Sequence, residues 1–273
     1  MFEQIAFDMP IAADAVAHEA AVAHEAASHG IHVALSPEVV TTIGGVPITN
    51  TLITSWMSAI LLLILAIGLG KRLALIPGRF QTFIETILTF LYDFVHETLD
   101  DAKWARRVFP LLITLFLFIL VSNWLEFVPG IKSITVKHDG HEVSLLRGPN
   151  TDLNTTLALA VVAVIFIEVM GIVAVGFWRY AGKFFNFSSP INFVLGLTEF
   201  IGEMTRFISF SFRLFGNIFA GEVLIAVVTF LVPYVIPVPF MAFEVFIGFV
   251  QASVFMLLTL FFIKFAITPV EGH

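Results

Sequence analysis

The fold is decided by residues 191–232, which read INFVLGLTEFIGEMTRFISFSFRLFGNIFAGEVLIAVVTFLV. Pro190 and Pro233 flank this apolar segment, and no proline lies between them. As a single α-helix the segment would extend roughly 63 Å, about twice the hydrocarbon thickness of a bilayer. A helical hairpin would need a turn, and the segment has no clear turn signal. We therefore predict one long helix that is strongly tilted and curved.

Ionisable residues interrupt this apolar segment and indicate a function inside the membrane. They are Glu199, Glu203, Arg206, Arg213 and Glu222. A charged side chain at the centre of a transmembrane helix costs roughly 2.5–3.5 kcal/mol on insertion scales. Glu199 and Arg206 can extend toward an interface, whereas Arg213 lies near the middle of the helix. Arg213 is therefore the principal candidate for an ion-transport residue.

Helical periodicity puts Arg213 on a face of small and polar residues. The residues within about 60° of it are Arg206, Ser209, Gly216, Asn217 and Ala220. A face of this kind allows another helix to approach closely. No acidic residue within one turn can neutralise Arg213, so we expect its partner on another helix or another subunit. Glu222 is half a turn round and is expected to point toward the outer-side interior of the chain.

The composition of the whole chain also indicates a membrane protein. Hydrophobic residues make up 58% of it and charged residues 13%, with a mean hydropathy of +0.96. Soluble domains are about half apolar and a quarter charged, so lipid is the expected solvent. Lipid-exposed segments must satisfy their own backbone hydrogen bonds, which predicts an all-α integral membrane protein with five transmembrane helices. The predicted spans are 51–69, 108–128, 157–177, 191–232 and 240–267.

The placement of Lys and Arg predicts the orientation. With the N-terminus outside, eight Lys and Arg residues lie in inner loops and three in outer loops, as the positive-inside rule requires. Residues 1–48 then form an outer tail, residues 49–268 the membrane domain and residues 269–273 an inner tail. The tail's repeat around His18 and His24 favours a solvated extension over a metal site, because a spacing of six puts the two histidines on opposite sides of a helix. The absence of Cys excludes disulfides and thiolate metal sites.

Residues 80–103 combine helical spacing of apolar side chains with an acidic arc. This pattern predicts an amphipathic helix that lies on the inner interface and does not cross the membrane. Its acidic face either is solvated or docks a partner subunit.

Polar residues near the ends of the spans suggest two paths for protons, one from the outer side and one from the inner side. Either Asp152 or Asn154 would make a good N-cap for the third span, and a role in an aqueous entry is equally open. Glu244 and Gln251 share one stripe of the last span. Glu222 and Glu244 lie at similar depth if their helices are antiparallel, which suggests a proton path entered from outside. A shared proton that joins two helices is the alternative. Glu199 suggests a second path on the inner side.

Three motifs give the chain a strong resemblance to subunit a of the F-type ATP synthase membrane sector. The specific motif is FRLFGNIFAGE at residues 212–222, supported by VQASVF at 250–255 and PNTDLN at 149–154. The order of five spans with an amphipathic insert matches over about residues 40–268. The first motif is highly specific, whereas the other two are weak alone.

The resemblance implies that the long helix wraps a rotating ring of c subunits. The family's arginine, matched by Arg213, faces the carboxylates of this ring. The access residues correspond by motif position to Ser209, Asn217, Glu222 and Gln251, and Glu199 matches an acid of the inner path. Glu244 stands where many bacterial relatives have histidine, which leaves the local proton count open.

The resemblance also implies a setting and a mechanism. The setting is a bacterial inner membrane with a periplasmic N-terminus, a cytoplasmic C-terminus, and b subunits of the peripheral stalk as further partners. No cofactor, metal or nucleic acid is implied, and the chain would perform no bond chemistry. A ring carboxylate loses its proton toward the inner path at Arg213, passes as an anion and is reprotonated from the outer path. Arg213 stays protonated and separates the two half-channels. A proton is favoured over sodium, although the ring would make that choice.

Two other functions compete with this interpretation. A self-contained proton-coupled secondary transporter would normally show internal repeats or broken helices, and neither is visible in the sequence. An assembly subunit of another respiratory complex would give Arg213 no reason to lie at the middle of the membrane. Copurification of this chain with a c ring would argue against both of these alternative functions.

Overall fold

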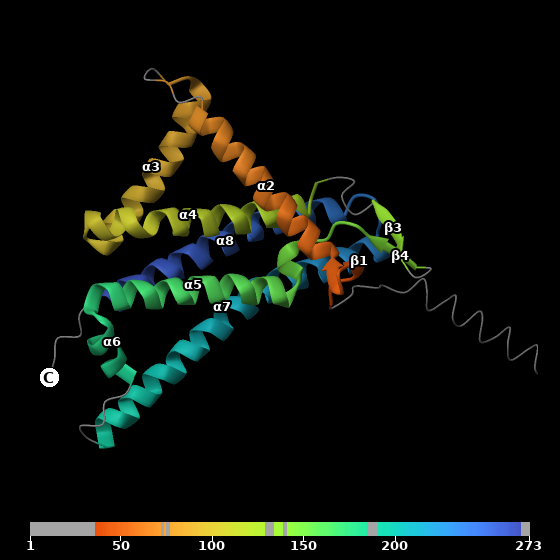
Figure 1. Ribbon diagram of the computed structural model, residues 1–273. Coiled ribbons are helices and arrows are strands. Elements are labelled where there is room, and N and C mark those ends of the chain that lie inside the picture. Colours follow the sequence, from red (N-terminus) through yellow and green to blue (C-terminus); the bar gives the residue numbers. More distant parts are fainter. Residues whose placement is uncertain are drawn as a thin grey trace, which may run out of the picture.

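The computed structural model describes residues 36–71, 74, 77–128, 134–138, 141–184 and 190–268 (Figure 1). The histidine-bearing repeat of the N-terminal tail and the predicted inner tail at 269–273 lie outside the described residues.

Five helices within the described residues are long and apolar enough to cross a membrane. They confirm the five predicted spans and are α2 (Asn50–Lys71), α4 (Ala102–Leu125), α5 (Leu153–Val175), α7 (Pro190–Leu231) and α8 (Pro237–Ile267). The 42 residues of α7 form one helix, as predicted from the absence of an internal proline. Figure 1 shows α7 running obliquely to α4 and α5.

The boundary between the amphipathic helix and the second span differs from the prediction. The amphipathic helix α3 (Arg79–Leu99) ends because Asp100 adopts a left-handed conformation with φ of 53°. Asp101 then caps α4, since its side chain accepts hydrogen bonds from the backbone N–H groups of Lys103 and Trp104. The second helix therefore starts at Ala102, before the apolar stretch that was used to locate it.

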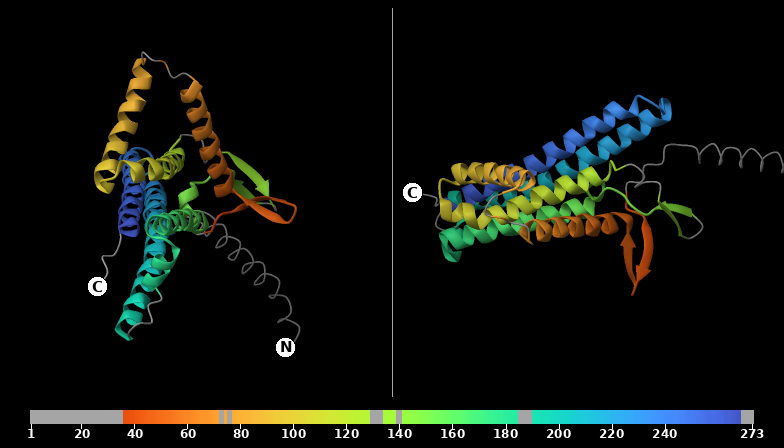
Figure 2. Two further views of the ribbon diagram at one scale, coloured as in Figure 1. Left: turned by 60° about the vertical axis from the view of Figure 1, so that its left-hand side comes forward. Right: turned by 90° about the horizontal axis from the view of Figure 1, so that it is seen from above.

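Two β-hairpins and two short helical elements were not part of the predicted all-α architecture. The strands β1 (Val39–Ile43) and β2 (Val46–Thr49) pair antiparallel, as do β3 (Thr135–His138) and β4 (His141–Ser144). The short helices are η2 (Pro149–Thr151) and α6 (Phe177–Phe184). Figure 2 shows the hairpins at one end of the helical bundle and the described C-terminal end of α8 toward the other.

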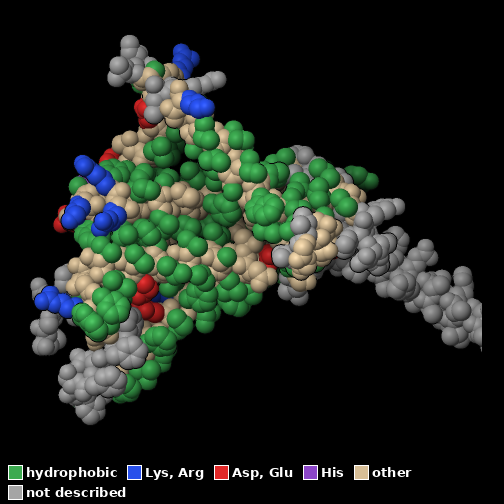
Figure 3. Space-filling view, viewed as in Figure 1, with side chains coloured by type: hydrophobic (Ala, Val, Ile, Leu, Met, Phe, Trp, Pro, Cys, Tyr) green, Lys and Arg blue, Asp and Glu red, His purple; other side chains and the backbone are tan. Residues whose placement is uncertain are grey.

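Packing places α8 among α4, α5 and α7, while α2 stands apart. The core contains Leu112 and Ile119 of α4 and Leu260 and Ile263 of α8, all fully buried. In contrast, most large side chains of α2 are exposed, and Figure 1 shows α2 diverging from the bundle. On the face shown in Figure 3, Lys and Arg side chains gather on the half of the molecule away from the hairpins.

Close approach of α4 and α8 depends on Gly248. A Cβ at this position would lie 2.9 Å from the Cβ of Asn123, and the Asn123 side chain donates a 3.1 Å hydrogen bond to the Gly248 carbonyl. Small residues allow such contacts between transmembrane helices.

We expect Gly248→Leu to lower the melting temperature of the detergent-solubilised protein, because the larger side chain separates α8 from α4. The matched control is Gly68→Leu in α2, where a Cβ would have nothing within 4 Å. Equal melting temperatures for the two variants would contradict the close packing.

Candidate ion-translocation site

Arg213 lies on a face of α7 that the rest of the chain leaves uncovered. The small and polar residues predicted to share this face are also exposed, namely Ser209, Gly216, Asn217 and Ala220. Arg213 forms no ion pair within the part of the chain that the structure describes. Its charge is therefore available to a group outside these residues.

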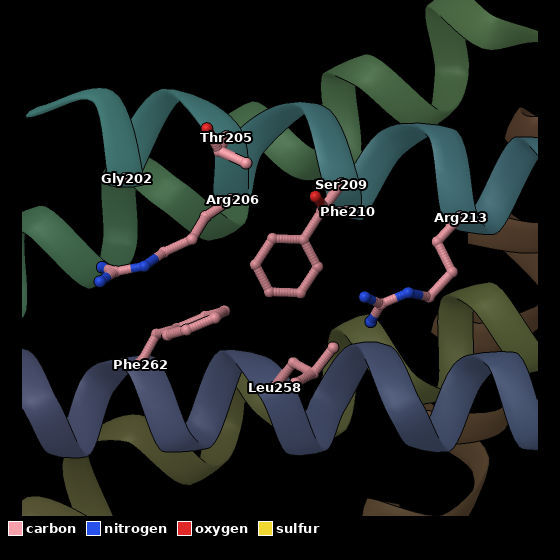
Figure 4. Close-up of a pocket in the computed structure, with 8 residues that line it drawn as sticks. All are labelled: Gly202, Thr205, Arg206, Ser209, Phe210, Arg213, Leu258 and Phe262. Atoms are coloured by element: carbon pink, nitrogen blue, oxygen red, sulfur yellow. The ribbon is translucent and has the colours of Figure 1, made fainter. Parts of the chain in front are cut away.

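A cavity of about 290 Å³ extends from Arg213 along the groove between α7 and α8. Figure 4 shows the guanidinium groups of Arg213 and Arg206 both reaching toward α8, with Phe210 between them. The remaining lining residues are Gly202, Thr205, Ser209, Leu258 and Phe262. The cavity therefore brings the predicted residues Ser209 and Arg213 together on one side of α7.

Arg206 connects this cavity to Glu199. An Arg206 Nη2 atom lies 3.6 Å from Glu199 Oε1, and the guanidinium carbon lies 4.7 Å from the Phe262 ring centroid. Both side chains of this ion pair are partly exposed. Glu203, one turn from Glu199, is buried.

Glu222 lies at the other end of α7 and pairs with Arg147. Arg147 Nη2 is 3.2 Å from Glu222 Oε2, and Arg147 Nη1 donates a 3.1 Å hydrogen bond to the carbonyl of Ser36. The backbone N–H of Arg147 donates to Thr54 Oγ1 at 3.2 Å. Arg147 thus joins α7 to the start of α2 and to the segment before β1.

Glu244 of α8 is buried directly against α7. Its carboxyl group occupies the space that a Cβ at Gly221 would need. Because Gly221 immediately precedes Glu222, the two acids lie at similar depth on neighbouring helices. Gln251 lies two turns along α8 and is partly exposed, and within the described ranges neither Gln251 nor Asn217 makes a side-chain hydrogen bond.

Asp152, and not Asn154, is the N-cap of α5. Asp152 Oδ1 accepts a 2.9 Å hydrogen bond from the backbone N–H of Asn154, and its Oδ2 accepts a 3.0 Å hydrogen bond from Thr51 Oγ1. Asp152 is buried and ties α5 to α2.

Other buried polar groups surround these acids and were not among the predicted site residues. Asn150 Nδ2 donates a 2.7 Å hydrogen bond to Asn123 Oδ1, while Asn150 Oδ1 and Ser122 Oγ have no hydrogen-bond partner among the described residues. The carboxyl group of Glu126 lies against Gly148. Glu126 could have been found from the sequence, because it is a carboxylate directly after an apolar span.

Arg147 was predicted only as one of three outer cations. Its position next to the PNTDLN motif is the sequence signal that could have marked it as a site residue. The described residues contain no group of three or more His, Asp or Glu side chains arranged to hold a metal ion.

The chain is similar to known proteins over most of its length. The family model described as ATP synthase A chain matches residues 52–264. The chain is 35% identical to ATP synthase subunit a of Moorella thermoacetica, over 85% of this chain and 95% of that protein. It is 33% identical to a sodium ion specific ATP synthase subunit a of Propionigenium modestum, over 86% and 79% of the two chains. It is 35% identical to ATP synthase subunit a of Geotalea uraniireducens, over 80% and 87%.

The family match covers residues 52–264, a range that includes Arg213 and Glu222 of the long helix and Glu244 of α8. The chain is a multi-pass membrane protein and belongs to the ATP synthase A chain family, the subunit a of F-type ATP synthases.

Proposed function

We propose that this chain is the static proton-conducting subunit of its ATP synthase, in which Arg213 separates two offset half-channels that serve a rotating c ring. The observation that carries the proposal is the position of Arg213 on the uncovered face of α7, with Glu222 and Glu244 gathered elsewhere on the helix pair. A charged guanidinium at this depth needs a partner, and a ring carboxylate would supply one.

Electrostatics gives the order of proton transfers. A ring carboxylate that reaches Arg213 is favoured in its charged form, so it releases its proton toward the inner path. It passes Arg213 as an anion and receives a proton from the outer path, after which the neutral acid enters lipid. Each charge that crosses contributes about 2.3 kcal/mol per 100 mV, and several charges together drive ATP formation in the attached catalytic head. The chain itself makes and breaks no covalent bond other than those to the proton.

The outer half-channel is built around Glu222 and Glu244. Arg147 compensates the charge of Glu222, and the buried polar side chains of Asn123 and Asn150 offer hydrogen bonds to water near these acids. Asp152 and Asn154 lie at the outer end of the adjacent helix, and Asn217 and Gln251 continue toward Arg213. On the inner side, Ser209 and Glu199 border the cavity that extends from Arg213.

We infer the orientation of the chain from the placement of its Lys and Arg residues, and its partners from its exposed apolar surface. Lys and Arg gather away from the hairpins, so the positive-inside rule puts the hairpins and the N-terminus on the periplasmic side of a bacterial inner membrane and the C-terminus in the cytoplasm. The amphipathic helix α3 lies on the inner interface. The exposed apolar surface of α2 is offered to lipid and to the b subunits of the peripheral stalk.

A self-contained proton-coupled secondary transporter remains the alternative function. It would need a carboxylate facing Arg213 within this chain, and the described residues provide no ion pair for Arg213. The continuous helix α7 also differs from the broken helices that are typical of such transporters.

We expect Arg213→Ala to abolish ATP-driven proton pumping by membrane vesicles while the complex still assembles, because the ring carboxylate loses the cation that favours its charged form. The control is Arg106→Ala, which removes an exposed arginine at the inner end of α4. Normal pumping by the Arg213→Ala complex would overturn the proposed function.

We expect Arg147→Met to destabilise the protein by about 3 kcal/mol, because it removes the guanidinium that pairs with the largely buried carboxylate of Glu222. The double variant Arg147→Met/Glu222→Gln should recover part of that loss, measured as the melting temperature in detergent. If the two single effects simply add in the double variant, Arg147 and Glu222 are not energetically coupled.

We expect Glu222→Gln to slow pumping and Glu244→Gln to change its dependence on the pH at the outer face, because each variant replaces a titrating carboxyl with an amide. Pumping is measured over a range of outer pH in right-side-out vesicles that are loaded with ATP. Unchanged rates across that range in both variants would rule out the two-acid outer path.

A further inference from the structure

Tyr180 of α6 is buried against α5. Its ring lies on Gly171, where a Cβ would collide with the ring carbons. The Tyr180 hydroxyl donates a hydrogen bond to the carboxylate of Glu168, which is three residues before Gly171 and hence on the same face of α5. Gly176, with φ of +92°, turns the chain between α5 and α6 and so brings the tyrosine back onto its neighbour.

The long helix contributes charges to the same place. The carboxylate of Glu203 and the guanidinium of Arg206 both act electrostatically on the Tyr180 hydroxyl. Glu203 is 8% exposed, and Arg206 lines the cavity that begins at Arg213. Three elements, α5, α6 and α7, therefore bring two carboxylates and one hydroxyl together, and Arg206 links this cluster to the cavity.

The surroundings of the Tyr180 hydroxyl disfavour its ionised form. Burial, followed by the hydrogen bond to Glu168 and the negative charges of Glu168 and Glu203, holds the pKa of Tyr180 far above its usual range, and the nearby Arg206 only partly opposes this. Tyr180 thus remains a hydrogen-bond donor at every physiological pH. The carboxyls of Glu168 and Glu203 are the groups in this cluster that can bind and release a proton.

We propose that Glu168 and Glu203 form a proton-binding site on the inner side of the cavity, with Tyr180 as the positioning residue that holds Glu168. The inference rests on the proposed function and names where a proton resides between the ring and the inner water. A proton released by a ring carboxylate binds to one of these carboxylates and forms a carboxylic acid. That acid then gives the proton to water on the inner side, and the carboxylate is restored with no change in electron count.

The alternative is that the Tyr180 hydroxyl only anchors α6 to α5. An anchor would affect stability and leave the pH dependence of transport unchanged. A hydrogen bond to a carboxylate that carries protons would affect both the rate and the pH dependence, because hydrogen bonding to the charged form favours that form.

The test is Tyr180→Phe in the complete ATP synthase, since phenylalanine keeps the ring on Gly171 and removes only the hydroxyl. Inverted membrane vesicles expose the inner face to the medium, so ATP-driven pumping can be followed as the inner pH is varied. We expect the maximal rate to fall on the order of tenfold. We also expect the alkaline limb of the profile to move to higher pH, because the variant loses a hydrogen-bond donor that favours the charged form of a carboxylate.

Three further variants make the result specific. Glu168→Gln should lower the rate to a similar extent, and adding Tyr180→Phe to it should change little, because the hydroxyl then has no carboxylate to position. The control is Tyr92→Phe, which alters a tyrosine on α3 whose ring contacts are with His96 and Phe109. Tyr92→Phe should leave both rate and profile unchanged.

An unchanged pH profile in Tyr180→Phe would overturn the proton-binding site, whether or not the melting temperature falls. Failure of this proposal is separable from failure of the proposed function. If Arg213→Ala abolishes pumping while Tyr180→Phe has the wild-type profile, the half-channel function stands and the inner site does not.

Discussion

The guanidinium of Arg213 stays charged at any physiological pH, and an apolar helix in lipid offers it nothing to balance that charge. Other features of α7 can be understood from this one constraint. The helix is long, so Arg213 lies far from both of its ends. The residues beside it are small, so a partner can come close enough to interact with it. The neighbouring helices leave this face open and pack on the opposite one.

At the other end of α7, an acidic side chain is balanced by an arginine of the same chain. Arg147 is the guanidinium that faces Glu222, while Glu126 and Glu244 place two more carboxyls on the helices around it. Uncompensated charge is costly in a buried setting, so the position of Arg147 beside Glu222 stabilises this end of α7. Glu244 adds a carboxyl close to the pair of Arg147 and Glu222.

The sequence alone was sufficient for those features that depend on local periodicity. Apolar length predicted the five helices, and the 100° step per residue predicted which residues share the face of Arg213. The acid–base partners could not be predicted in this way. Arg147 reaches Glu222 across 75 positions of sequence, and Tyr180 reaches Glu168 only because Gly176 turns the chain back. The pairing of β1 with β2 was predictable, since Gly44 and Gly45 are a strong hairpin signal.

Two polar clusters lie toward opposite ends of α7. The residues between them decide whether protons could leak from one cluster to the other through the interior of the chain. Between Glu203 and Glu222, the buried side of the helix consists of Phe210, Leu214 and Ile218, with Phe210 against Phe255 of α8.

The buried polar residue in that stretch is Ser211, whose hydroxyl is engaged with Thr156 of α5 at 3.1 Å. Within the described residues, the interior of the chain thus offers no continuous set of polar groups between the clusters. Under the proposed function, a proton that enters at the outer acids would therefore pass by way of the open face that carries Arg213. On that face the positive charge would repel a free proton, and the ring carboxylate would carry it instead. The apolar core beside α7 would then be as necessary to coupling as the arginine.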